Sequence, residues 1–220
     1  MDKIQESAAD SDADTTALYM LRTMAEMQDE HNRRVHPNWR AQDYEYYRAI
    51  WVECAELLDH FGWKWWKKQV PDLAQVKLEI VDIWHFGLSE MLRARQLNDD
   101  CVTVLVALET ATETDVAAFR AAVEKLARVT LTKRSFDIDA FAGVMRELPM
   151  SFGELFDLYV GKNVLNNFRQ DHGYKSGEYR KIWSNREDNE HLVEVLEELD
   201  CPPAEVPDVL YAALEARYPG

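Results

Sequence analysis

The sequence predicts an all-α fold formed by one helical domain. Apolar residues recur at spacings of three and four through most of the 220 residues, which is the pattern of helices that bury one face. Strand-like runs are scarce, and the one β-like stretch, residues 101–108, fits a helix equally well. Hydrophobic side chains make up 47% of the chain, enough to form a sizeable core in a protein of this length.

The domain is expected to span residues 15–220. Residues 1–14 are acidic and poor in apolar side chains, so we expect a disordered tail there. An Ala-rich, amphipathic stretch at about 99–150 is interpreted as a helical insertion that forms packing or dimer surface. Helices are predicted within it near 115–129 and 137–148.

The first helix is predicted to begin near Asp14. Its apolar stripe runs from Leu18 to Ala25, and two amides, Gln28 and Asn32, continue the same stripe. Buried amides need hydrogen-bond partners, which can be neighbouring backbone or the polar edge of a bound ligand.

The second predicted helix covers about Asp43 to His60. Glu53 and Glu56 are three residues apart, so they share one strip of the helix, at the edge of its apolar face. The connection that follows, Gly62–Lys67, holds three tryptophans in four residues and offers packing and stacking surface.

The third predicted helix ends near Gln96. It starts at a pattern that resembles a capping box, in which Asp72 is followed three residues later by Gln75. Glu79 and Asp82 repeat the acidic spacing of the second helix and also border an apolar stripe.

The C-terminal part is predicted to hold a helix over about 151–170. A Gly-containing segment follows at 171–179. Two acidic helices are expected over about 187–217, broken at Cys201–Pro203 because proline cannot continue a helix.

The two acidic pairs predict a metal site. Four carboxylates in a half-buried cleft, from Glu53, Glu56, Glu79 and Asp82, repel one another and lose hydration, so a cation is needed to offset the cost. Oxygen ligands alone favour Mg²⁺, with Mn²⁺ as the alternative, over zinc. The opposing interpretation is a solvated helix face, on which Glu at this spacing is common.

The net charge of −15 argues against broad binding to nucleic acids, because their phosphates would be repelled. An anionic substrate therefore needs local positive charge. One basic cluster consists of the lysines at 64–68, and a second consists of Lys162, Arg169, Lys175, Arg180 and Lys181. The alternative for each cluster is an ordinary solvated surface.

No apolar run approaches the roughly 18 residues that span a bilayer, and the chain starts with polar and acidic residues. We therefore expect a cytoplasmic protein that binds no membrane. Cys54, Cys101 and Cys201 are an odd number of distant cysteines, which argues against a disulfide framework. The sequence also lacks the P-loop, GxGxxG, HExxH and GxSxG motifs.

Three consecutive segments carry a family resemblance. Glu53–Leu57, Trp63–Lys67 and Val76–Phe86 resemble the dimeric dUTPase family of the all-α NTP pyrophosphatase superfamily. The acidic pairs alone would also fit MazG-like and dCTP pyrophosphatases. The Trp/Lys segment and His85-Phe86 favour dUTPase.

The ends of the resemblance agree with it. Lys162–Lys175 resembles the phosphate-binding segment of that family, and Gln28 with Asn32 resembles its first, base-reading motif. Residues 99–150 match no motif of the family, whose middle region is variable. The resemblance implies a helical bundle of the all-α NTP pyrophosphatase type with a variable insertion.

The resemblance also implies an activity. We expect Mg²⁺-dependent hydrolysis of dUTP to dUMP and pyrophosphate, and of dUDP to dUMP and phosphate, by a homodimer with two or more metal ions per site. Glu53 is the expected general base. The alternatives are a sister nucleotide pyrophosphatase with another base preference and a non-enzymatic helical dimer.

The resemblance assigns the remaining site residues to two groups. The expected phosphate ligands are Lys162, Arg169, Tyr174 and Lys175, the arginine through its bidentate fork. The expected base and sugar contacts are Gln28, Asn32, Trp63, His85, Phe86, Asn163 and Asn166. A carboxamide carries both a donor and an acceptor, so it can read the uracil edge.

Overall fold

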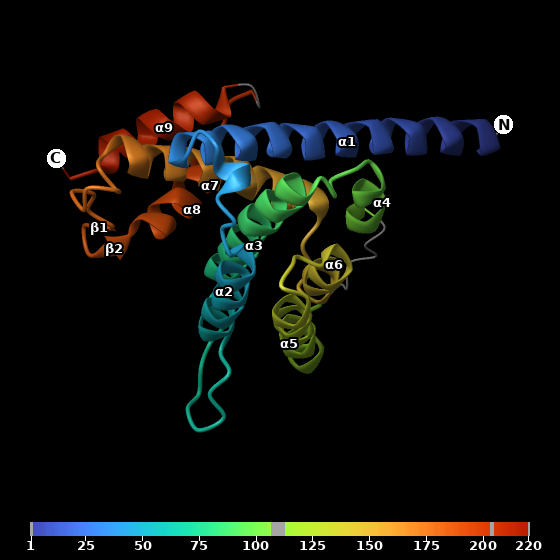
Figure 1. The fold of residues 1–220 in the computed structure, drawn as a ribbon, viewed down its shortest axis with the longest axis horizontal. Coiled ribbons are helices and arrows are strands. Elements are labelled where there is room, and N and C mark those ends of the chain that lie inside the picture. The colour runs from blue at the N-terminus through green and yellow to red at the C-terminus, as the bar shows by residue number, and fades with distance from the viewer. Residues whose placement is uncertain (1, 107–112, 203–204, 220) are drawn as a thin grey trace.

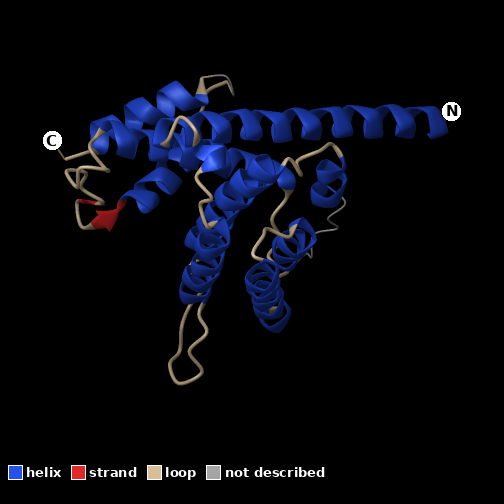
Figure 2. Cartoon of the chain, in the orientation of Figure 1, coloured by secondary structure: helices blue, strands red, loops and turns tan. Residues whose placement is uncertain are grey.

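A computed structural model describes residues 2–106, 113–202 and 205–219. Helices dominate it, which confirms the all-α prediction, and Figure 2 shows one small patch of strand. The elements are α1 (Asp2–Val35), the short 3₁₀ helix η1 (Trp39–Ala41), α2 (Tyr46–Phe61), α3 (Leu73–Ala94), α4 (Asp100–Val106), α5 (Val116–Lys133), α6 (Ile138–Glu147), α7 (Phe152–Asp171), β1 (Ile182–Trp183), β2 (Arg186–Glu187), α8 (Asp188–Glu198) and α9 (Val206–Arg217).

Short polar side chains start four of these helices. Asp72 accepts a hydrogen bond from the backbone N–H of Gln75 (3.2 Å), which confirms the predicted start of α3. Asp115, Asp137 and Ser151 cap α5, α6 and α7 in the same way. Both helices predicted inside the insertion are therefore present.

The helices α2 and α3 form a hairpin whose connecting loop protrudes from the body of the molecule (Figure 1). Their apolar faces meet in the larger core, where Ile50, Leu57, Ile80 and Trp84 are fully buried. The long α1 and the parallel-running α7 cross the open end of this hairpin, and both contact α3. This arrangement brings the acidic pairs of α2 and α3 close to the polar side chains of α1 and α7.

A second core packs α8 and α9 against α7. Trp183 of the β1–β2 hairpin is fully buried in it, beside Phe168 and Leu192. Gly161 permits the close approach of α8, because a Cβ there would lie 2.7 Å from Leu196 Cδ1. The hairpin was not predicted, since strands of two residues are too short to show an alternating pattern.

Two further expectations are modified. The helix α1 begins at Asp2, ahead of the start near Asp14 that the sequence predicts. The division into a tail at 1–14 and a domain at 15–220 stays a prediction. The β-like run at 101–108 is helical as far as Val106, and its last two positions lie outside the described residues. Within the described part of the chain, no helix is long and apolar enough to cross a membrane.

Candidate functional site

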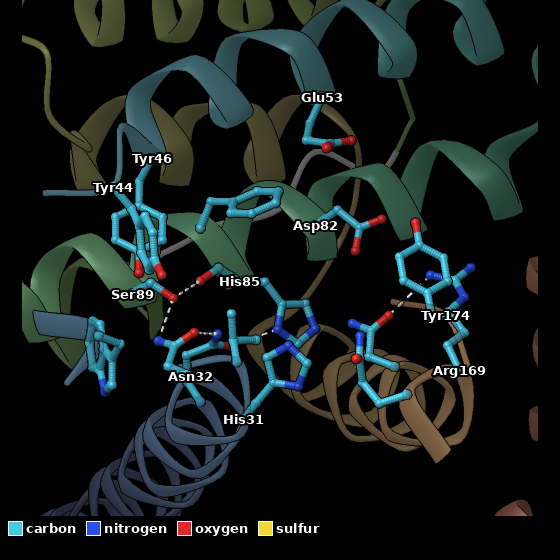
Figure 3. Close-up of a pocket in the computed structure, with 16 residues that line it drawn as sticks. His31, Asn32, Tyr44, Tyr46, Glu53, Asp82, His85, Ser89, Arg169 and Tyr174 are labelled. Atoms are coloured by element: carbon cyan, nitrogen blue, oxygen red, sulfur yellow. Dashed lines mark hydrogen bonds between the residues drawn. The ribbon is translucent and has the colours of Figure 1, made fainter. Parts of the chain in front are cut away.

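A cavity of about 370 Å³ with both polar and apolar lining lies where α1, α2, α3 and α7 meet (Figure 3). Side chains from four separated parts of the sequence line it. The predicted site residues among them are Gln28, Asn32, Glu53, Asp82, His85, Phe86, Asn166, Arg169 and Tyr174. The tertiary structure therefore brings together nine of the residues that the sequence singled out.

An acidic cluster lies at the α2 and α3 side of the cavity. Carboxylate oxygens of Glu53, Glu56 and Glu79 lie within 4.8 Å of one another. Burial, with the negative charge of Asp82 as the next cause, raises the pKa of both Glu53 and Glu79 well above the usual range of a carboxyl group. Burial and mutual repulsion therefore disfavour the charged forms of Glu53 and Glu79, a cost that a bound cation would relieve.

Asp82 differs from the other three acids. Its Oδ2 lies 2.8 Å from Nζ of Lys162, and the lysine side chain is only 2% exposed. Lys162 also donates to Asn189 Oδ1 at 2.9 Å. The structure thus places this lysine behind Asp82, as its counter-ion, and does not point it freely at the cavity.

Arg169 lines the cavity, but its bidentate fork is already engaged. Its Nε donates to Asp188 Oδ2 at 2.8 Å and its Nη2 donates to Asp188 Oδ1 at 2.9 Å. Burial lowers the pKa of Arg169, while the bonds and the charge of Asp188 outweigh burial and raise it. Both arms of the fork bind Asp188 in this conformation, and a bidentate contact of Arg169 with a phosphate stays a prediction.

Tyr174 and Lys175 follow the end of α7. Tyr174 lines the cavity and is half exposed. Lys175 is exposed, and its Nζ lies 3.4 Å from the carbonyl oxygens of Arg34 and Val35 at the end of α1. It lies near the rim and does not line the cavity.

The two predicted amides form a buried network at the base of the cavity. Gln28 Oε1 accepts from Tyr159 Oη at 2.9 Å and lies 2.7 Å from His85 Nδ1. Gln28 Nε2 donates to Asn32 Oδ1, and Asn32 Nδ2 donates to Ser89 Oγ at 2.9 Å. From the sequence, the expected partners of these amides were backbone groups or a bound ligand, whereas in the structure their partners are other side chains.

This network also defines the state of His85. Its ring stacks on Tyr159 at 4.3 Å, and burial lowers its pKa well below the ordinary value, so the ring is neutral. Because Gln28 Oε1 can only accept, Nδ1 must carry the proton. His85 Nε2 has no hydrogen-bond partner among the described residues and is left as a buried acceptor.

The other predicted base contacts are divided. Phe86 lines the cavity, and so does Asn166, whose Oδ1 accepts from Arg169 Nη1. Asn163 is buried next to the site, where it accepts from Asn167. Trp63 is not brought to the cavity, because it follows the far end of α2, whose last residue, Phe61, lies about 12 Å along the helix axis from Glu53.

Sequence reasoning missed several residues that hold the site. Tyr159 could have been found, because it begins a polar strip on α7 that continues through Lys162, Asn166 and Arg169 at helical spacing. Asp188 and Asn189 carry no such signal. They lie on α8, and only the packing of α8 against α7 brings them to the side chains of Lys162 and Arg169.

The fold and the site define a helical protein in which a cluster of carboxylates lies beside a cavity that Arg169 and the amides Gln28 and Asn32 also line. A family model described as dUTPase matches residues 20–174, and the chain belongs to the dUTPase family. A search of curated proteins gives no match. Family membership confirms the resemblance found in the sequence and supports dUTP nucleotidohydrolase activity in general terms.

Proposed function

We propose that this protein is a Mg²⁺-dependent enzyme that hydrolyses dUTP to dUMP and pyrophosphate, and dUDP to dUMP and phosphate. The observation that carries the proposal is the position of the acidic cluster, which lies at the same cavity as Arg169 and the buried amide network. A nucleotide needs a cation site and a basic side chain for its negatively charged phosphates, and it needs polar groups for the edge of its base.

The acidic cluster fits the proposed metal. Its oxygens are hard ligands, and the raised pKa values of Glu53 and Glu79 mean that a divalent cation would relieve their repulsion. Mg²⁺, or Mn²⁺, with two or more ions per site, would be held by Glu53, Glu56, Glu79 and Asp82. When bound, such an ion neutralises phosphate charge and lowers the pKa of a coordinated water.

Glu53 is the proposed general base. It is the acid of the cluster that also lines the cavity together with Asp82. In the reaction a water oxygen attacks phosphorus, the water proton passes to the Glu53 carboxylate, and pyrophosphate leaves with the electron pair of the broken P–O bond. The carboxylate is restored when the proton is lost to solvent.

The remaining residues bind the nucleotide. Arg169 and Tyr174 contact phosphate oxygens directly, Lys175 acts from the rim, and Lys162 acts through Asp82. For the base and sugar, Asn32 and Asn166 supply amide groups, neutral His85 supplies an acceptor at Nε2, and Phe86 supplies a stacking face. Gln28 acts mainly by holding His85 and Asn32.

A homodimer is part of the proposal. In the α2–α3 loop the indoles of Trp63, Trp65 and Trp66 are exposed, Trp65 by 90%. Such a patch is costly in water, and a second copy would cover it. Sedimentation velocity should give a dimer for the wild type and a shift toward monomer for Trp65→Ser with Trp66→Ser. An unchanged dimer would place the interface elsewhere.

The activity is tested with a substrate panel. The purified protein is incubated with Mg²⁺ and, separately, with dUTP, dUDP, dCTP, dTTP and UTP, and the products are identified. Conversion of dUTP to dUMP and pyrophosphate supports the proposal. Preferential cleavage of dCTP or another nucleotide would indicate a sister pyrophosphatase, whereas no cleavage would favour a non-enzymatic helical dimer.

A further inference from the structure

Asp188, the first residue of α8, binds the side chain of Arg169, which lines the cavity. Asp188 is fully buried, and both of its oxygens accept from Arg169 in a fork-to-fork pair at 2.8 and 2.9 Å. It lies outside residues 20–174, which the family model matches. We infer that Asp188 is a positioning residue that sets the orientation of the Arg169 guanidinium toward the phosphates of the substrate.

The geometry of the arginine supports this role. A guanidinium has five N–H donors in one plane. In Arg169 two of them bind Asp188, one reaches Asn189 Oδ1 at 3.3 Å, and one on Nη1 reaches Asn166 Oδ1 at 3.1 Å. The other N–H on Nη1 is not needed for these four contacts, and Arg169 lines the cavity, so we take this N–H as the one available to a ligand. Because the fork fixes the plane, this N–H is presented to a ligand without loss of side-chain freedom.

Asp188 is itself held firmly. Tyr179 Oη donates to its Oδ2 at 2.8 Å, and its backbone N–H donates to the carbonyl of Lys181 at 3.0 Å. Tyr179 in turn stacks on Tyr218 with ring centroids 5.5 Å apart. Burial raises the pKa of Asp188, but the Arg169 hydrogen bond and charge outweigh burial and lower it, so the group stays ionised.

The next residue of α8, Asn189, also holds a second basic side chain of α7, that of Lys162. Asn189 Oδ1 accepts from Lys162 Nζ at 2.9 Å as well as from Arg169. The first two residues of α8 therefore hold both buried cations of α7. Lys162 reaches Asp82, and Arg169 reaches the cavity, so α8 acts as a scaffold for the site without lining it.

The test compares variants of one helix and rests on the proposed function. Asp188→Asn removes the charge and keeps the shape, and Tyr179→Phe removes only the hydroxyl that holds Asp188. Glu194→Gln is the matched control, because Glu194 also lies on α8 and pairs with Arg186 and Arg217 at 2.8 Å, away from the cavity. KM and kcat for dUTP, the Kd for α,β-imido-dUTP, and the thermal unfolding midpoint are measured for each.

We expect Asp188→Asn to raise KM and Kd by about tenfold or more, since a charge-assisted hydrogen bond to a phosphate is weakened. Tyr179→Phe should shift both in the same direction by a smaller factor with the fold intact, and Glu194→Gln should leave them unchanged. In an Arg169→Ala background, Asp188→Asn should cause no additional rise in KM, because the residue acts through Arg169.

Three results would overturn the inference. The first is an active wild type whose KM and Kd change less than about twofold in both Asp188→Asn and Tyr179→Phe, since the expected loss is at least tenfold for the former. The second is an equal loss in Glu194→Gln, which would assign α8 a purely structural role. If the wild type neither turns over dUTP nor binds the analogue, the proposed function falls, and this inference falls with it.

Discussion

Replacing Lys162 by methionine tests the electrostatic organisation of the site. The substitution keeps the buried aliphatic stem of Lys162 and removes the ammonium group that lies 2.8 Å from Asp82. Asp82 is then left without its cationic partner, and its negative charge acts on Glu53 and Glu79. The charged forms of these two acids are already disfavoured by burial and repulsion. Removing one partner of a buried ion pair costs about 3–5 kcal/mol. The lower end applies here, because a fifth of the Asp82 side chain is exposed.

A matched control exists on the same two helices. Lys77 of α3 pairs with Glu154 of α7, and both side chains are partly exposed, at 26% and 37%. Lys77→Met should therefore cost only about 0–1 kcal/mol. In metal-free buffer, a loss of about 3 kcal/mol corresponds to a melting point lower by about 6–12 °C for Lys162→Met in a chain of this size. Equal shifts for the two variants would refute the assignment of Lys162 as the buried counter-ion of Asp82.

Three further predictions concern the cavity. Glu53→Gln should abolish dUTP turnover while the melting point in metal-free buffer stays equal or rises, because a neutral amide avoids the cost of burial and repulsion that raises the pKa of Glu53; retained turnover would refute the role of Glu53 as base. Addition of Mg²⁺ should raise the melting point of the wild type, and Glu79→Gln should reduce that rise; a rise of the same size in Glu79→Gln would argue that the ion binds elsewhere. The pKa of His85 is lowered in the folded state, so the unfolded chain binds its proton first and stability is lost as the pH falls below about 6.5. Urea titrations of the wild type and His85→Gln from pH 7 to 5 should show a smaller acid-side loss in the variant, and parallel curves would contradict a buried neutral ring.

The periodicity of the chain predicted its helices well. Asp72 starts α3 where the sequence placed it, and α5 and α6 lie within a few residues of the predicted ranges. These features depend on neighbours in sequence, such as a capping side chain and an apolar stripe, so they can be read without tertiary information. The β1–β2 hairpin could not, because Ser184 and Asn185 adopt positive φ in a turn whose strands are stabilised by burial of Trp183.

The site likewise contains residues that the sequence pattern revealed and contacts that it did not. Glu53, Glu56, Glu79 and Asp82 were found because their spacing places each pair on one strip of a helix. The occupation of the Arg169 fork by Asp188 was not found, because 19 residues separate the two and no periodicity connects them. Trp63 was assigned to the site from resemblance, and the length of α2 carries it away from the cavity of its own chain.

The sequence by itself determined which side chains are chemically equipped for the proposed metal-dependent reaction on a nucleotide, and which faces of the helices carry them. The tertiary structure alone decided which of those groups are free to meet a ligand. Lys162, Arg169 and Gln28 look equally available in the sequence, yet each has partners in the fold. The physical reason is burial, since a charge or amide removed from water must be paired, and its partner comes from whichever helix packs against it.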